Sequence, residues 1–540
     1  AADAAKIAAE APVLGQEEPY RLALQRALTR FRVAAPNLTL ALGGKGPDVR
    51  LNGPVTLTSA SGVTVAVTPK GLRFTDGVSG AASLAVSGDG LPTIALDASQ
   101  ISMRGETVSA QIALTTALDF GPAKDAALSI KGLARSDRAG FSFTSAACAS
   151  LKAERLDFGE TQVEQPSAQL CPTDGAPLVV ARQGGWRLAG RLQEGRAAIP
   201  VLMITVDGAA GGFVLAGDDK GAMTAEVSLA DIGVTDTANP LRFNPLRAGG
   251  AARLSGDIWR GEFQARTEAG HAVAKIGLEH DQRSGAGHAD IDASQLRFTP
   301  AGLQPADITP QAVVLDHAQG PASFVGRMTW SAEAPANGTG RMTTPGLDFI
   351  SPVGAVAQLK ADVTFTSLAP LVTADDQVVT ANLIEAFAKL SDIKLVFDLA
   401  GEVLHIDAGA LSAVGGRLEL EPIALPLTKE TTVRGAIVVD KVNLGDVIAL
   451  TSYADRIKAD LVVNGRLPFE AGPGGFKFER GTLATIRPGR LAINRSVLSG
   501  VETGAAEVQA PDLGGETVGT PDVNAVQDMA FQAMENLAVD

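Results

Sequence analysis

Three histidines come closest to a reactive or metal-binding arrangement in this chain. His280 and His288 flank a glycine-rich stretch, so a hairpin turn would bring them face to face, and His271 lies nearby in the sequence. Imidazole nitrogens on such a hairpin could bind zinc, but a zinc site needs further ligands in a defined geometry. The local sequence supplies no such ligand, so we interpret the histidines as surface residues of an ordinary hairpin.

Other chemistry-bearing patterns are absent or belong to turns. The sequence contains no P-loop, HExxH or GxSxG motif, the usual signatures of nucleotide hydrolases, zinc proteases and serine hydrolases. The carboxylate pairs Asp218-Asp219 and Asp375-Asp376 stand in polar turn sequences, where solvated side chains are usual. We therefore expect no catalytic residue, no metal site and no cofactor, and the chain is predicted not to be an enzyme.

Cys148 and Cys171 are the only cysteines. No metal-ligand spacing surrounds them, and one pair fits one disulfide, which would persist in an oxidising compartment such as the periplasm. The bond would close a loop of about two dozen residues and stabilise the fold by about 3 kcal/mol. Two unrelated buried thiols that pack as small hydrophobic groups are the alternative.

The composition favours an extended, repetitive architecture and argues against nucleic acid as a partner. The chain has 540 residues, of which 45% are hydrophobic, 4% are aromatic and 59 are glycine, so Ala, Val, Leu and Ile carry the apolar content. A formal charge of −14, with no run of four Lys or Arg, argues against nucleic acid as a partner. The same overall charge predicts repulsion by an anionic membrane surface.

Most of the chain reads as β-strands. Apolar and polar residues alternate with a period of two, as from Ile393 to Leu399, and Gly, Asn-Gly or Asp-Gly bound the runs. The most apolar segment, residues 197–217, is interrupted by Asp207-Gly208, which predicts two strands joined there by a hairpin turn and no membrane span. Further turns are predicted at Asn52-Gly53, Asp76-Gly77, Asp89-Gly90 and Asn464-Gly465.

Helical patterns are few. Amphipathic helices are predicted over Pro19–Phe31 and Asp522–Val539, and a short one after Asn443, whereas the pattern from Asn382 to Leu390 is undecided. The expected organisation is an N-terminal helical segment (1–35), the N-terminal and middle part of an elongated sheet (36–360), its C-terminal part (361–521) and a C-terminal amphipathic helix (522–540).

The predicted fold is therefore mainly β: one elongated, curled, antiparallel-rich sheet with few short helices. Because so few helices cannot cover so large a sheet, the sheet must either close face to face or leave an apolar groove covered by something other than protein. Small aliphatic residues suit a groove that admits acyl chains. The residues predicted to line it are Ile393, Leu395, Phe397, Leu399, Leu418, Leu420, Leu461, Val463, Phe476 and Phe478.

From about Val363 onward the sequence resembles the C-terminal region of the YdbH family, a branch of the AsmA-like proteins. Four stretches carry the resemblance: TFTSLAPL (364–371), GGRLELEPIAL (415–425), NGRLPFE (464–470) and MAFQAMENL (529–537). Cys148 and Cys171-Pro172 are also similar to cysteines of that family.

The resemblance implies a periplasmic β-taco groove that moves phospholipid between the inner and outer membranes. It implies an inner-membrane anchor in a segment outside this sequence. As a partner it implies a small outer-membrane lipoprotein, which would add a β-strand at the C-terminal edge of the sheet, near residues 460–490.

Two other classes of protein are alternatives for a chain of this composition and strand pattern. A secreted or periplasmic structural or adhesive β-solenoid would have the same strands around a closed, dry core. A polysaccharide-active β-helix enzyme would need aromatic sugar platforms and clustered acids, and the chain has only 3 Trp and 2 Tyr.

Overall fold

The computed structural model describes fourteen stretches of the chain. They are residues 30–42, 49–75, 77–88, 91–120, 123–158, 161–331, 334–351, 354–385, 389–401, 403–426, 432–450, 454, 457–472 and 475–493. The predicted helix at residues 522–540 and most of the predicted helical segment 1–35 lie outside these stretches.

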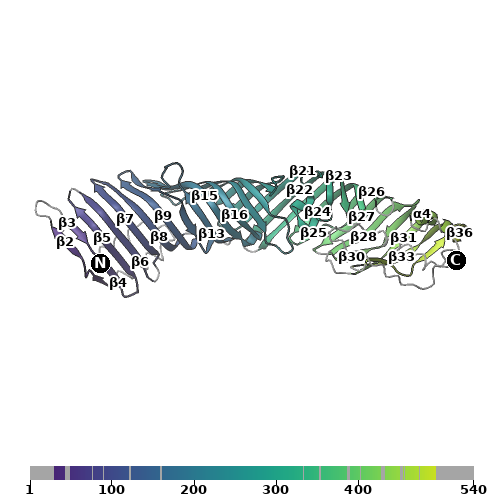
Figure 1. The fold of residues 1–540 in the computed structure, drawn as a ribbon, viewed down its shortest axis with the longest axis horizontal. Coiled ribbons are helices and arrows are strands. Elements are labelled where there is room, and N and C mark those ends of the chain that lie inside the picture. Colours follow the sequence, from purple (N-terminus) through teal and green to yellow (C-terminus); the bar gives the residue numbers. More distant parts are fainter. Residues whose placement is uncertain are drawn as a thin grey trace, which may run out of the picture. The chain divides into compact units, whose positions relative to one another are not determined.

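The described residues form an almost purely β structure, which confirms the predicted fold class. The structure is 75% strand and 4% helix, with one sheet of 34 strands and one of two strands. The chain divides into two compact units: Ala1–Asp290 with Thr329–Ala336 (unit 1), and Ile291–Met328 with Asn337–Asp540 (unit 2). In both units the strands follow one another in chain order, and their neighbours in the sheet run antiparallel (Figure 1).

The strands before the first unit boundary are β1 (Phe31–Ala34), β2 (Thr39–Leu42), β3 (Val49–Asn52), β4 (Val55–Ser59), β5 (Thr64–Phe74), β6 (Val78–Ser87), β7 (Thr93–Arg104), β8 (Thr107–Phe120), β9 (Ala123–Asp137), β10 (Gly140–Ser145), β11 (Ala149–Lys152), β12 (Arg155–Phe158), β13 (Thr161–Cys171), β14 (Val179–Arg182), β15 (Gly185–Ile199), β16 (Ile204–Asp218), β17 (Met223–Asp236), β18 (Leu246–Ser255), β19 (Ile258–Thr267) and β20 (Ala272–Asp281).

The later strands are β21 (Gly287–Phe298), β22 (Asp316–Ser331), β23 (Ala334–Ser351), β24 (Gly354–Leu368), β25 (Leu371–Thr373), β26 (Gln377–Glu385), β27 (Lys389–Ala400), β28 (Val403–Ala413), β29 (Gly416–Leu420), β30 (Ile423–Pro426), β31 (Val433–Asn443), β32 (Ile457–Asp460), β33 (Val462–Gly472), β34 (Gly475–Phe478), β35 (Thr482–Thr485) and β36 (Arg490–Ile493). The described helices are η1 (Pro200–Leu202), α3 (Pro305–Ile308), η2 (Pro310–Ala312) and α4 (Leu444–Ala449).

Many of the long strands contain a β-bulge, where the register between neighbours shifts by one residue. Four bulge residues have the same local structure. Each has φ between 48° and 68° and donates its backbone N–H to an Asn or Asp side chain on the neighbouring strand. The pairs are Gly71 with Asn52 (2.5 Å), Asp125 with Asp119 (2.9 Å), Gln358 with Asp348 (2.7 Å) and Lys441 with Asn464 (2.7 Å). Because a bulge leaves one N–H without its ladder partner and bends the strand, these side chains stabilise the bends that curl the sheet.

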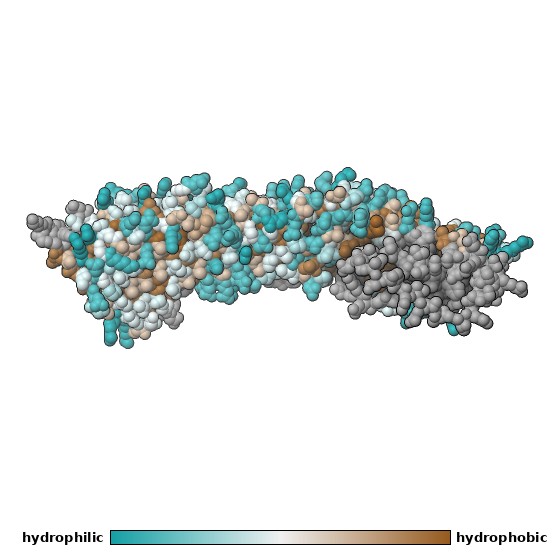
Figure 2. Space-filling model, in the orientation of Figure 1, coloured by the Kyte–Doolittle hydropathy of each residue, from teal (hydrophilic) through white to brown (hydrophobic). Residues whose placement is uncertain are grey.

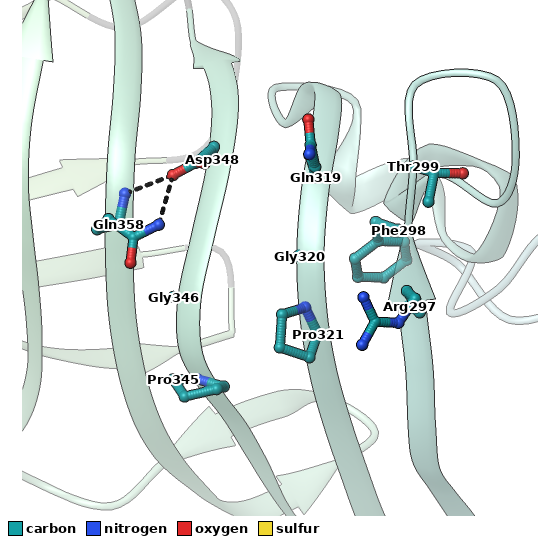
Figure 3. A pocket seen from close by; sticks show the side chains of 10 residues that line it. All are labelled: Arg297, Phe298, Thr299, Gln319, Gly320, Pro321, Pro345, Gly346, Asp348 and Gln358. Carbon is teal, nitrogen blue, oxygen red and sulfur yellow. Dashed lines mark hydrogen bonds between the residues drawn. The ribbon is translucent and has the colours of Figure 1, made fainter.

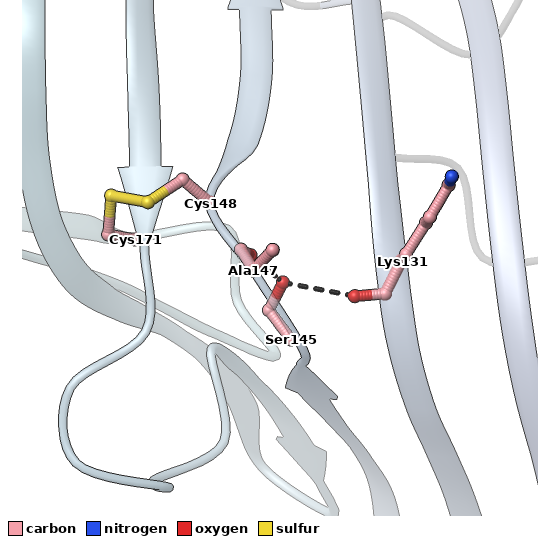
Figure 4. Close-up of a disulfide and its surroundings, with 5 residues drawn as sticks. All are labelled: Lys131, Ser145, Ala147, Cys148 and Cys171. Atoms are coloured by element: carbon pink, nitrogen blue, oxygen red, sulfur yellow. Dashed lines mark hydrogen bonds between the residues drawn. A yellow bond between two sulfur atoms is a disulfide. The ribbon is translucent and has the colours of Figure 1, made fainter.

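A disulfide joins Cys148 and Cys171, as the sequence predicted, with Cα atoms 4.0 Å apart (Figure 4). Cys148 lies between β10 and β11, and Cys171 is the last residue of β13. No strand runs through Cys148, and β13 ends at Cys171. Immediately beside the bond β11 pairs with β13, with Ala149 opposite Leu170. The disulfide therefore joins two neighbouring strands where the ladder of backbone hydrogen bonds is broken.

Two predicted hairpin turns are wrong, because the strands continue through both sites. Asp207-Gly208 lies inside β16, with Gly208 at φ 61° where the pairing with β17 shifts, and the turn before β16 is instead formed by η1. Asn464-Gly465 lies inside β33, where Asn464 accepts the hydrogen bond from the bulge at Lys441. An Asx-Gly pair suits a left-handed backbone in a bulge as well as in a turn.

The predicted helices have mixed outcomes. The short helix after Asn443 is confirmed as α4, and the Asn443 side chain caps it by accepting the Gly445 N–H at 2.9 Å. Phe31, the last residue of the predicted helix Pro19–Phe31, is extended and begins β1; residues 19–29 lie outside the described part. The undecided stretch from Asn382 to Leu390 contributes to strands β26 and β27.

Candidate functional site

The strands of unit 1 present an apolar face and a charged face. Along β15 to β20 the register places Leu188, Leu215, Ala225, Leu254, Trp259 and His280 opposite one another in a single row. A second row, two residues along each strand, contains Gly190, Phe213, Val227, Ala252, Gly261 and Leu278. Because side chains alternate across a strand, these rows share one side of the sheet, which we call the inner face.

The opposite side, the outer face, carries cross-strand ion pairs. The row between the two apolar rows consists of Glu226, Arg253, Arg260 and Glu279, with Arg253 2.9 Å from Glu226 and Arg260 2.9 Å from Glu279. All four side chains are exposed, so each pair contributes little to stability. Their importance here is that they identify the solvent side of the sheet.

Unit 2 has the same two faces. One inner row runs through eight strands, and its members are Thr344, Ala361, Val379, Leu395, Gly409, Leu420, Ile437 and Leu467. On the outer face Arg341 pairs with Asp362, and Arg434 pairs with Glu470 at 2.8 Å. The Arg341 guanidinium donates to the Asp362 carboxylate and holds the pKa of that carboxyl below its usual value.

The structure brings most of the predicted lining residues onto this inner face. Leu395 and Leu420 belong to the row just described, Ile393 lies opposite Ala381, and Phe397 and Leu399 lie opposite Ile406 and Leu404. Leu418 lies opposite Val439, and Val463 lies opposite Val442.

The remaining predicted lining residues lie near the C-terminal end of unit 2. Leu461 lies between β32 and β33 and is buried against Val439, Val442 and Val463. Phe478 lies opposite Phe469. Phe476 pairs through its backbone with Ala471. The register therefore places the predicted residues side by side, although their contact with a ligand stays a prediction.

Aromatic rings on the inner face lie over glycines of neighbouring strands. A Cβ atom built on Gly217 would lie 2.5 Å from the Trp186 ring, one on Gly250 would lie 2.8 Å from the Phe263 ring, and one on Gly435 would lie 2.6 Å from the Phe469 ring. Each ring thus occupies space that any larger residue would fill. Glycine at these three positions therefore makes room for the ring on the neighbouring strand.

Protein covers the inner face only in part. Among the described residues, Leu444 and Val447 of α4 pack against the cluster around Val439, and Ile308 of α3 packs against the cluster around Leu347. Elsewhere Leu395, Leu418 and Leu420 remain half-buried. Figure 2 shows hydrophobic residues in patches between hydrophilic ones on the side of the molecule in view.

Two depressions occur among the described residues of unit 2. One, of about 390 Å³, lies over the bulge of β24, where Asp348 accepts hydrogen bonds from the Gln358 backbone (2.7 Å) and side chain (3.2 Å) (Figure 3). The other, of about 540 Å³, includes the outer-face residues Arg341, Thr343 and Thr364. Each depression is lined by both polar and apolar residues, and we assign no ligand to either.

The histidines do not form a metal site in the described part of the chain, where no cluster of three metal-ligating side chains occurs. His280 instead lies on the inner face, and its Nδ1 accepts a hydrogen bond from Trp330 Nε1 at 3.3 Å. Burial lowers the pKa of His280, which favours the neutral ring that this bond requires.

Sequence reasoning missed the position of the tryptophans. Trp186 and Trp259 lie on the inner face, and Trp330 contacts His280 there. A local signal exists, because Trp186 alternates with Arg187, and Trp259 and Phe263 alternate with Arg260 and Glu262, as a period of two requires. The described part of the chain also contains no helix long and apolar enough to span a membrane.

The described part of the chain is an antiparallel β-sheet protein whose sheet has one charged face and one apolar face that protein covers only in part. Residues 6–501 match the family model described as YdbH-like, intermembrane phospholipid transport protein YdbH. The chain therefore belongs to the YdbH-like family, which confirms the resemblance seen in the sequence. Comparisons with curated proteins and with solved structures found no match.

Proposed function

We propose that this protein moves phospholipid between the inner and outer membranes, with the acyl chains lying along the inner face. The observation that carries the proposal is the run of apolar rows across successive strands, in which Leu395, Leu418 and Leu420 remain half-buried. Apolar surface left in water costs about 25 cal/mol per Å², so a face of this extent needs a cover. Acyl chains fit it because the rows are mainly apolar and continue from strand to strand.

The headgroups would stay in water at the open side of the groove, so the lining needs no charged recognition site. The proposed location is the periplasm, which the family description and the disulfide both support, since a disulfide persists in an oxidising compartment. No chemical step is part of this proposal: the protein supplies a path and no catalytic residue.

The tryptophans supply the test. All 3 Trp of the chain lie on or against the inner face, so phospholipid brominated on its acyl chains should quench the intrinsic fluorescence of the purified protein. Quenching should decrease in the Trp186→Phe and Trp259→Phe variants, whose rings are half-buried. Unbrominated lipid is the control, and unchanged fluorescence in a protein shown by extraction to carry the brominated lipid would contradict the proposal.

A second proposal concerns the partner at the C-terminal edge. Among the described residues β34 and β35 both pair with β33, so each has one side open to another strand. Together with the family resemblance, this supports strand addition by a small outer-membrane lipoprotein. A photo-crosslinker at the exposed Lys477 should capture that lipoprotein in cells, whereas one at Lys275 of β20 should not. Crosslinks from Lys477 to soluble proteins alone would count against it.

A further inference from the structure

The N-terminal end of the sheet differs from the rest of the chain in charge and in exposure. Residues 30–75 contain six Lys or Arg and one Asp, a formal charge of +5 in a chain whose total is −14. Five large apolar side chains between residues 31 and 42 are exposed: Phe31 (40%), Val33 (55%), Leu38 (40%), Leu40 (61%) and Leu42 (74%). The negative charge of the whole chain predicts repulsion by anionic membranes, but the charge of this segment is positive.

These residues lie on the edge of the sheet. Among the described strands β1 pairs only with β4, and β2 pairs only with β3, so both are edge strands (Figure 1). The register separates apolar from basic side chains: Leu40 lies opposite Leu51 on one face, whereas Arg50 lies opposite Arg73 on the other. Arg32 of β1 and Arg73 of β5 are both exposed.

The edge is continuous with the inner face. Starting at β1, one row of paired residues runs through Val33, Leu57, Val65, Val86, Ile94, Thr116 and Leu128. An acyl chain that reached Val33 would therefore meet apolar side chains as far as Ile94 of β7, and beyond Thr116 of β8 it would meet Leu128 of β9.

We propose that this edge, the strands β1 to β3 with the paired end of β5, docks on a bilayer that contains anionic phospholipid. The exposed leucines would enter the boundary of the acyl region while the arginines reach phosphate groups, as in other amphipathic elements that lie at a membrane surface. A second copy of the chain is a poorer occupant, because two ends of like charge would repel each other. The inference rests on the proposed function, since docking delivers lipid to the inner face.

Vesicle co-sedimentation of the full chain tests the docking. Phosphatidylcholine vesicles with added phosphatidylglycerol should bind the protein, pure phosphatidylcholine should bind it weakly, and high salt should reduce the difference. Each basic residue at an anionic surface contributes about fivefold to binding, so Arg32→Gln with Arg73→Gln should weaken it about 25-fold. Leu40→Ser with Leu42→Ser should weaken it at least tenfold.

The matched control is Arg253→Gln with Arg260→Gln, which makes the same charge change on the outer face of β18 and β19 and should leave binding within twofold. Equal loss of binding in this control would show a general charge effect and overturn the inference. Leucine variants that melt lower but bind normally would overturn it too, because another part of the chain would then cover the edge. Tryptophan quenching by brominated lipid is measured separately. A protein that does not bind vesicles but is still quenched would therefore contradict the docking inference and leave the proposed function intact.

Discussion

Replacing Leu395 by Asp is expected to reduce lipid transfer between vesicles at least tenfold while the protein stays folded. Leu395 and Leu420 flank Gly409 in one inner row, where a Cβ on Gly409 would lie 3.4 Å from Leu395 and 3.1 Å from Leu420. An ionised carboxylate there would have to lose water whenever an acyl chain passes, at a cost of several kcal/mol. Each ~1.4 kcal/mol added to the barrier slows transfer tenfold.

The same substitution separates a groove from a closed core. Leu395 is half-buried, so in a groove the Asp carboxylate keeps contact with water and the variant loses only about 1 to 2 kcal/mol of stability. In a closed core the unpaired carboxylate would be dehydrated and the region would unfold. Thermal melts recorded beside the transfer assay distinguish these outcomes.

Two variants at the same place serve as controls. Val396→Asp introduces the same group on the next residue, which the register places on the outer face opposite Val378, and it should transfer lipid normally. Leu395→Met keeps an apolar side chain of similar volume and should also transfer normally. A folded Leu395→Asp variant with normal transfer would show that acyl chains do not follow this row.

The composition of the inner face could be predicted from sequence, because alternation needs only the period of two. Ile393, Leu395, Phe397 and Leu399 alternate with outward neighbours, and the structure places them on one side of β27. The pairing across strands could not be predicted. That Leu395 meets Gly409 depends on the register shifts within β27 and β28, for which the sequence has no turn or length signal.

The bulges explain the wrong turn predictions. Gly208 and Gly465 stand next to Asp and Asn, and each dipeptide by itself is typical of a hairpin. In the fold the strands continue through both sites. In three of the four bulges whose backbone N–H donates to an Asn or Asp side chain, the residue with the left-handed backbone is not glycine but Asp125, Gln358 or Lys441. The presence of glycine therefore does not predict these bulges either. Their acceptors, such as Asp348, look like ordinary polar strand residues.

Removing Arg242 is expected to destabilise unit 1 by about 3 to 5 kcal/mol, because it leaves a buried carboxylate without its partner. The Asp236 side chain is fully buried (0% exposed), and its carboxylate accepts from Arg242 Nη2 at 2.6 Å and Nε at 3.1 Å. Arg242 Nη2 also donates to the carbonyl oxygens of Leu202 (2.7 Å) and Met203 (3.2 Å). The pair thus joins the loop after β17 to the turn before β16. The exposed pair Arg253 with Glu226 is the control, and Arg253→Ala should cost less than about 1 kcal/mol.

The loss should depend on pH in one direction. Burial by itself would raise the pKa of Asp236, but the hydrogen bonds from Arg242 and Ala238 outweigh it and hold the pKa below its ordinary value. A carboxylate whose pKa is lower in the folded than in the unfolded chain stabilises the fold above about pH 4, and that stabilisation is lost as pH falls through the folded pKa. Urea unfolding should therefore show a large difference between wild type and Arg242→Ala at pH 7 and a smaller one near pH 3. Equal losses at both pH values would mean that Arg242 acts through packing rather than through its charge on Asp236.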